Sequence, residues 1–108
     1  MTRLVACVPD LMDRSKVAAV VPDAVFVADP AALVAAARDQ GAERIVVDLG
    51  RPGALAAIAE LAGDGVDVIG FASHVELDLL ERARAAGGAT VLTRAIFFRR
   101  LPELLAPT

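Results

Sequence analysis

The strongest constraint on the fold is an alternation between two kinds of segment that repeats five times along the chain. Short runs rich in β-branched residues alternate with alanine-rich segments whose apolar residues recur at helical spacing. This alternation is typical of parallel strands joined by crossover helices, because parallel strands need a long connection. The strand candidates are nearly continuous apolar runs, as expected for strands buried on both faces, and they cover residues 4–8, 24–28, 44–47, 66–71 and 90–92.

The segments between these strands carry helix start and stop signals. Asp10, with Asp13 three residues later, can cap a helix after the first strand. The second helix has Asp29 as a candidate N-cap, Pro30 at its first position and Gly41 at its end. Both segments therefore predict helices with defined ends.

Two further helices are predicted between the third and fifth strands. The third helix begins near Pro52 and is expected to bury one face, formed by Leu55, Ile58, Ala59 and Ala62. Ser73 and Glu76 have the spacing of a capping box and predict the start of the fourth helix. The expected core side of that helix is formed by Val75, Leu79, Ala83 and Ala86.

The last segment is interrupted by Pro102, which disfavours helical geometry at Leu101. We therefore expect a short turn around Phe97 and Phe98, followed by a stub of helix from Pro102.

Composition limits the classes of function. The 108 residues suit one domain over 1–108, and 56% hydrophobic residues predict a folded core. A net charge of −3 disfavours binding to nucleic acid or to anionic membranes. The single cysteine, Cys7, excludes an internal disulfide and fits a reducing cytoplasm, and no apolar run has the length of a membrane span.

Five such units joined by right-handed crossovers most often form a sheet of strand order 2-1-3-4-5, with a crevice at the carboxyl ends of strands 1 and 3. Asp10 and Asp48 follow those strands, and two carboxylates at one crevice suit a Mg²⁺ ion. Arg94 follows strand 5 and has the length to reach strand 3. The alternatives are structural: Asp10 as a helix cap, Asp48 in a turn, and Arg94 as a solvated surface side chain.

Three segments resemble a bacterial response-regulator receiver domain, and the resemblance extends over residues 4–105. The segment 45–53 is similar to the family's apolar strand, its phospho-accepting aspartate, here Asp48, and a following Pro-Gly pair. The segments 90–94 and 68–74 resemble the family's strands 5 and 4. The resemblance implies a flavodoxin-like α/β sandwich of three layers, here with the last helix shortened by Pro102.

The resemblance is weaker in the residues that carry the chemistry. The family's acidic pair after strand 1 is here Pro9-Asp10, and its switch hydroxyl falls on Ala72, with Ser73 one residue out of register. The family's lysine is Arg94, and the proline after it is Ala95. Mg²⁺ binding by Asp10 and Asp48 is therefore expected to be weak at most. We expect Arg94 to pair with Asp48 by charge-assisted hydrogen bonds and to hold the site in one state.

The favoured function is a stand-alone pseudo-receiver in two-component signalling, which is not an enzyme, needs no cofactor and binds a protein partner or a second copy of itself. The resemblance implies an interface on the fourth helix, fifth strand and last helix. The residues expected on that face are Leu80, Arg84, Arg94, Arg99 and Arg100, with Phe97 and Phe98 nearby. A shortened last helix is expected to leave apolar surface there, which favours a homo-oligomer.

The alternative is a working phospho-acceptor, in which Asp48 is the nucleophile, Asp10 a Mg²⁺ ligand and Arg94 the partner of the phosphoryl oxygens. An enzyme with a nucleotide in the crevice has little support, because the chain has neither G-x-G-x-x-G after strand 1 nor a P-loop. His74 is expected in a loop, and Cys7 is expected to act as a small buried hydrophobe.

Overall fold

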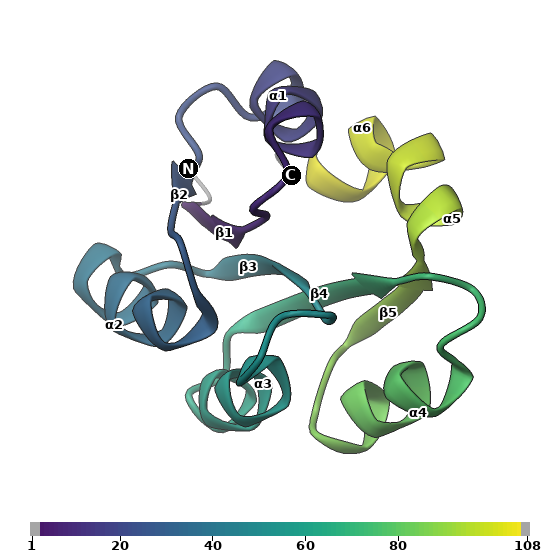
Figure 1. The fold of residues 1–108 in the computed structure, drawn as a ribbon. Helices are drawn as coiled ribbons and strands as arrows, with labels where there is room; N and C mark the ends of the chain where they lie inside the picture. Colours follow the sequence, from purple (N-terminus) through teal and green to yellow (C-terminus); the bar gives the residue numbers. More distant parts are fainter. Residues whose placement is uncertain (1–2, 107–108) are drawn as a thin grey trace.

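The computed structural model describes residues 3–106 and contains one five-stranded parallel sheet of order β2-β1-β3-β4-β5 (Figure 1). The strands are β1 (Leu4–Cys7), β2 (Val25–Phe26), β3 (Arg44–Asp48), β4 (Asp67–Ala72) and β5 (Thr90–Thr93). The helices are α1 (Leu11–Val20), α2 (Pro30–Gln40), α3 (Ala54–Gly63), α4 (Leu77–Ala85), α5 (Arg94–Arg99) and α6 (Leu101–Leu105). The predicted fold class and strand order are confirmed.

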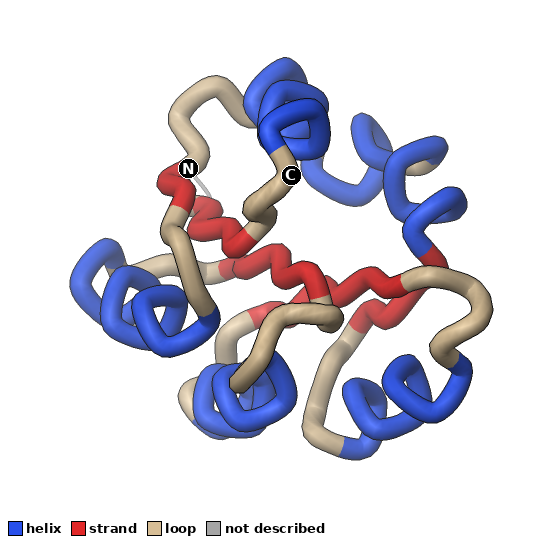
Figure 2. The backbone as a smooth tube through the Cα atoms, viewed as in Figure 1, coloured by secondary structure: helices blue, strands red, loops and turns tan. Residues whose placement is uncertain are grey.

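The helices form a layer on each face of the sheet (Figures 1 and 2). On one face α2, α3 and α4 pack through buried side chains such as Leu33, Ile58 and Leu80. On the other face α1, α5 and α6 pack through Val17, Phe97 and other apolar residues. Alternate residues of each central strand serve the two cores, which explains the unbroken apolar runs in the sequence.

Local signals predicted the first two helices correctly. The Asp10 carboxylate accepts hydrogen bonds from the backbone N–H groups of Met12 and Asp13, at 2.9 and 3.0 Å. Asp29 caps α2 through the N–H of Ala32 at 2.8 Å, and Gly41 ends that helix at φ 61°. A positive φ favours glycine, which has no Cβ.

The predicted core faces of α3 and α4 need correction. The buried face of α3 contains Ala54, Ala57, Ile58 and Leu61, so only Ile58 of the four expected residues is fully buried. Small alanines on every side of this helix make its apolar stripe ambiguous in the sequence. Helix α4 begins at Leu77 rather than at Ser73, and Val75 is 74% exposed in the preceding turn.

The predicted turn around Phe97 and Phe98 is wrong, because α5 is helical there. The chain then restarts as α6 at Leu101, with Pro102 in its first turn, where a missing N–H is tolerated. The Arg44 guanidinium donates a hydrogen bond to the backbone oxygen of Leu104 at 3.0 Å and ties α6 to the sheet. The C-terminal segment therefore forms two short helices, α5 and α6, and not one continuous helix. Within residues 3–106, no helix is long and apolar enough to cross a membrane.

Candidate functional site

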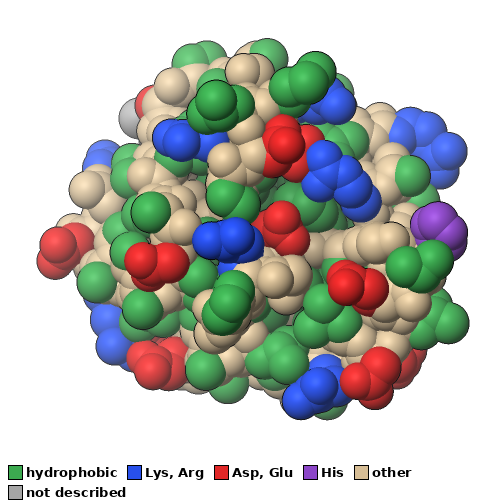
Figure 3. Space-filling view, in the orientation of Figure 1, with side chains coloured by type: hydrophobic (Ala, Val, Ile, Leu, Met, Phe, Trp, Pro, Cys, Tyr) green, Lys and Arg blue, Asp and Glu red, His purple; other side chains and the backbone are tan. Residues whose placement is uncertain are grey.

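The candidate site lies at the carboxyl end of the sheet, where β1, β3 and β5 run into the segments that carry Asp10, Asp48 and Arg94. In Figure 3 the purple side chain of His74, the only histidine, marks the turn between β4 and α4, and acidic and basic side chains alternate near the middle of the face. Parallel strands place all of these residues on the same side of the molecule, as the sequence predicts.

Asp48 ends β3 and is partly exposed. Its Oδ1 accepts a hydrogen bond from the backbone N–H of Gly50 at 3.0 Å, which is an Asx-turn within the loop after the strand. The turn holds the Asp48 carboxylate over its own loop. This geometry is compatible both with a purely structural role of Asp48 in the turn and with a role of Asp48 in a functional site.

Arg94 forms its ion pair with Asp13 of α1, not with Asp48. The expected Arg94–Asp48 pair is therefore wrong. Asp13 reaches Arg94 because it points from α1 into the core between this helix and α5, where it is only 1% exposed. The hydrogen bond to Asp13 is the main cause that raises the pKa of Arg94, with smaller contributions from Asp48 and Asp10. Arg94 thus lies near three carboxylates but is bonded to the buried one.

The second oxygen of Asp13, Oδ2, is buried and has no hydrogen-bond partner among the described residues. A buried carboxylate is costly without a compensating charge, so the position of Asp13 depends on the Arg94 guanidinium.

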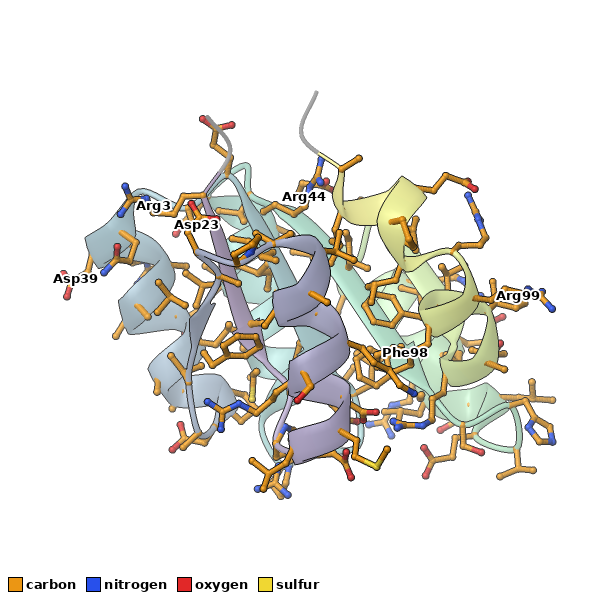
Figure 4. All side chains as sticks on the ribbon, turned by 90° about the horizontal axis from the view of Figure 1, so that it is seen from above. Arg3, Asp23, Asp39, Arg44, Phe98 and Arg99 are labelled. Carbon is orange, nitrogen blue, oxygen red and sulfur yellow. The ribbon has the colours of Figure 1, made fainter. Side chains whose placement is uncertain are left out.

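The Arg94 side chain packs against a cluster of aromatic rings. The rings of Phe71 and Phe97 are stacked with centroids 4.7 Å apart, and Phe98 packs edge-on against both. The Arg94 guanidinium lies 5.1 Å from the Phe98 centroid and 5.8 Å from that of Phe71. Phe98 points from α5 toward the space between α5 and α1 (Figure 4). These cation–π contacts and the Asp13 pair hold Arg94 in one orientation.

The sequence pattern predicts only a capping role for Asp13, although it also contains a signal for the burial of this residue. Asp13 precedes Val17 by four residues, so the two share one face of α1, and Val17 is fully buried. A charged residue on the buried stripe of a helix requires a partner, and Arg94 is that partner.

Each acidic residue near Arg94 already takes part in a hydrogen bond. Oδ1 of Asp10 caps α1, Oδ1 of Asp48 accepts from Gly50, and Asp13 is bonded to Arg94. Across residues 3–106, no three acidic, histidine or cysteine side chains come close enough to hold a metal ion. Mg²⁺ binding by Asp10 and Asp48 stays a prediction, and it would compete with the turn and cap that these carboxylates form.

Comparison with known structures identifies the fold. The chain superposes on the receiver domain of NtrX from Brucella abortus with a TM-score of 0.78 and 17% identity, covering 94% of this chain and 92% of that one. It also superposes on the chemotaxis response regulator CheY4 of Vibrio cholerae, with a TM-score of 0.81, 15% identity and coverage of 97% and 96%. This chain has a receiver-domain fold.

A third receiver-fold match is a chain from the co-crystal of the Saccharomyces cerevisiae histidine phosphotransfer protein Ypd1 with the receiver domain of its downstream response regulator Ssk1. Its TM-score is 0.82 at 10% identity, with 96% of this chain and 86% of that chain covered. In another NtrX structure the chain spans only 26% of the NtrX polypeptide. No family model matches the sequence, and no curated protein matches it significantly.

The end of β4 in this receiver fold has no hydroxyl in the expected place. Ala72 is the last residue of β4 and is 4% exposed. Ser73 follows it on the surface, where its Oγ accepts a hydrogen bond from the N–H of Val75 at 3.4 Å instead of capping α4. Neither residue offers a hydroxyl from within the strand.

The expected interaction face of the receiver fold is less apolar than predicted. Leu80 is 3% exposed and Phe97 is completely buried, so both belong to the core and not to an interface. Arg84 bonds to Glu81 and to the Val91 backbone oxygen, and Arg99 points away from the molecule (Figure 4). Leu80 and Phe97 are covered because α4 and the α5–α6 pair close over the two faces of the sheet.

The exposed large hydrophobic side chains lie instead at the carboxyl end of the sheet. Among residues 3–106 they are at least 68% exposed and occur in two short segments, at Leu11 and Met12 in the first turn of α1, and at Val75 and Leu77 around the start of α4. Both segments directly follow strands β1 and β4. We call these four residues the apolar rim.

Cys7 and His74 carry no site. Cys7 is fully buried in β1, and this burial raises the pKa of its thiol, which therefore stays protonated at neutral pH. His74 is exposed in the turn before α4.

Proposed function

We propose that this receiver-fold chain is a signalling module that acts by contact with a protein partner and does not take up a phosphoryl group efficiently at Asp48. The observation that carries the proposal is the ion pair between Arg94 and the buried Asp13. A cation that stabilises an acyl phosphate on Asp48 must be free to turn toward its oxygens, and here the guanidinium is bonded elsewhere and packed on Phe98.

The rest of the site supports the same conclusion. Asp10 caps α1, Ala72 has no hydroxyl, and no three acidic, histidine or cysteine side chains gather within residues 3–106. Without a divalent cation, the negative charges of the Asp48 carboxylate and an incoming phosphoryl group repel one another. The chemistry of the surrounding residues therefore disfavours the transfer.

We place the partner surface on the apolar rim rather than on the face of α4, β5 and α5. The rim contains the large exposed apolar side chains, and the polar centre with Arg94 lies at the same end of the sheet. Methionine and arginine are both enriched at protein interfaces relative to the rest of the surface. The Ssk1 receiver domain, which shares the fold, is crystallised with a protein partner. Self-association remains a prediction for X-ray scattering at increasing concentration.

The test is the intact mass of the chain after incubation with acetyl phosphate and Mg²⁺. We expect no phosphate adduct above the level of the Asp48→Asn variant, while a phospho-accepting receiver domain treated in parallel gains one. An adduct that requires Asp48 would contradict the proposal.

The competing function is phospho-acceptance at Asp48, and one observation favours it: Asp48 is partly exposed at the end of β3, and its Oδ2 forms no hydrogen bond within the described residues. In that reaction the carboxylate oxygen attacks phosphorus, the bond from phosphorus to the acetate oxygen breaks, and acetate leaves with the electron pair. The mass experiment decides between the two functions.

A further inference from the structure

A groove between α2 and α3 lies outside the candidate site and has a composition of its own. The groove has a volume of about 380 Å³. Its walls are mostly apolar, with one acidic residue at the start of α2 and one within α3. The lining residues are Asp29, Pro30, Ala31, Val34, Pro52, Gly53, Ala56, Ala57 and Glu60. None of these residues is basic. In Figure 3 acidic and apolar side chains lie over α2 and α3, together with basic side chains nearer the edge of the molecule.

The two helix starts form the walls of this groove. Asp29 caps α2 through Oδ1, which leaves Oδ2 available to an occupant. Gly53, at φ 88°, begins α3 without a side-chain cap, and a Cβ at this position would lie 3.9 Å from Pro30. The walls are thus close together, apolar and negatively charged at their edges.

Glu60 keeps capacity for a further cation. Arg38 approaches Glu60 at 3.4 Å, but its shorter contact, at 2.9 Å, is with Asp64. The hydrogen bond to Asp64 is also the main cause that raises the pKa of Arg38. Arg38 is therefore directed mainly to Asp64, and a second guanidinium can approach Glu60.

From the charge and shape of the lining we infer that the α2–α3 groove receives an arginine side chain of a protein partner. The aliphatic part of arginine suits the apolar walls formed by Pro30, Val34 and Ala56, while its guanidinium suits the carboxylates of Asp29 and Glu60. The volume is in the range of pockets that hold small ligands or single side chains. This inference is independent of whether Asp48 is phosphorylated.

The experiment is a titration of the full chain, followed by ¹H–¹⁵N spectra, with N-acetyl-arginine-N-methylamide as the probe. The neutral isostere N-acetyl-citrulline-N-methylamide is the chemical control. We expect the arginine probe to shift the amide signals of the groove, such as Ala31, Val34 and Ala56, and the citrulline probe to leave them in place.

The variant for this test is Asp29→Asn with Glu60→Gln. Asparagine is also a good N-cap, so α2 keeps its start, and the circular dichroism spectrum checks the fold. The double variant removes the two proposed ion pairs between the probe guanidinium and the carboxylates of Asp29 and Glu60. Because these pairs would be partly exposed, their loss is expected to weaken binding of the probe by about three- to tenfold. Asp39→Asn is the matched control, because Asp39 lies on the same helix but points away from the groove (Figure 4), and its affinity should equal that of the wild type.

Four results would overturn the inference: equal binding of citrulline, unchanged affinity in the double variant, equal loss of affinity in Asp39→Asn, or probe-induced shifts only at the apolar rim. Shifts of the groove signals on dilution without probe would assign the groove to a second copy of the chain and would also overturn it.

Discussion

Among individual residues, the ion pair between Arg94 and Asp13 has the clearest consequence for stability. Asp13 is buried with one oxygen unpartnered, whereas the Arg94 side chain is 45% exposed. The two partners are therefore not equivalent. Removing only the Arg94 cation leaves the buried Asp13 charge without compensation. Replacing both residues by apolar ones instead leaves an apolar contact at the same place.

This asymmetry predicts the outcome of a double-mutant cycle. Arg94→Met should lower the free energy of unfolding by about 3 kcal/mol, and Asp13→Leu in the same chain should restore most of the loss. Urea unfolding followed by circular dichroism measures both. Equal stability of Arg94→Met and the wild type would mean that Asp13 does not depend on the guanidinium.

A second residue-scale prediction concerns acid titration of Asp64. The hydrogen bond from Arg38 lowers the pKa of Asp64 below its ordinary value of 3.8. Because the folded-state pKa is depressed, the pair contributes stability above the unfolded-state pKa and loses it as pH falls through the folded-state pKa. NMR titration of the carboxyl carbon should give a midpoint below 3.8, and Arg38→Ala should move it back toward that value. A midpoint that does not respond to Arg38→Ala would contradict the assignment.

At the scale of elements, Asp10 illustrates how a residue can fit a site in the sequence and serve a helix in the structure. Its Oδ1 accepts from two N–H groups of the first turn of α1. Those N–H groups have no partner inside the helix, so a side-chain cap has a defined value for stability.

The cap role predicts a specific order of stability among variants. Asp10→Ala should lower the free energy of unfolding by about 1 kcal/mol, whereas Asp10→Ser and Asp10→Asn should stay close to the wild type. Chemical denaturation measures the series. If Asn and Ser were as destabilising as Ala, the charge of Asp10 rather than its capping geometry would be the important property.

At the scale of the whole molecule, the two faces of the sheet are closed and the carboxyl end is open. Leu101 and Leu105 of α6 are each 3% exposed and complete one face, while α2, α3 and α4 cover the other. Large apolar side chains are exposed at the apolar rim, which is why we propose the contact surface at this end of the sheet rather than on the predicted face.

The stability of the whole chain should not respond to Mg²⁺. A ligand that binds only the folded state raises the melting temperature by mass action, so about 10 mM Mg²⁺ should leave the temperature unchanged relative to EDTA if no site exists. Differential scanning calorimetry is the measurement, with Asp48→Asn as the control chain. A rise that is present in the wild type and absent in the variant would establish a metal site at Asp48.

The sequence by itself determined the five strands, the first four helices and the order in which they alternate. Local signals that depend on a few neighbouring residues were sufficient for this. They are the apolar runs of strand length, the helix caps Asp10 and Asp29, and the glycine at the end of α2, Gly41. The strand order follows from the handedness of crossover connections, which is the same in nearly all such folds. These features need no knowledge of distant contacts.

Only the tertiary structure decided which charges pair and which apolar side chains remain exposed. Arg94 and Asp13 are separated by 81 positions, and their pairing depends on how α1 packs against α5. Asp48 ends β3, two strands from β5, and was an equally charged candidate, but Asp13 is buried and Asp48 is not. Burial sets the energetic need for a partner, and burial is a property of the packed molecule.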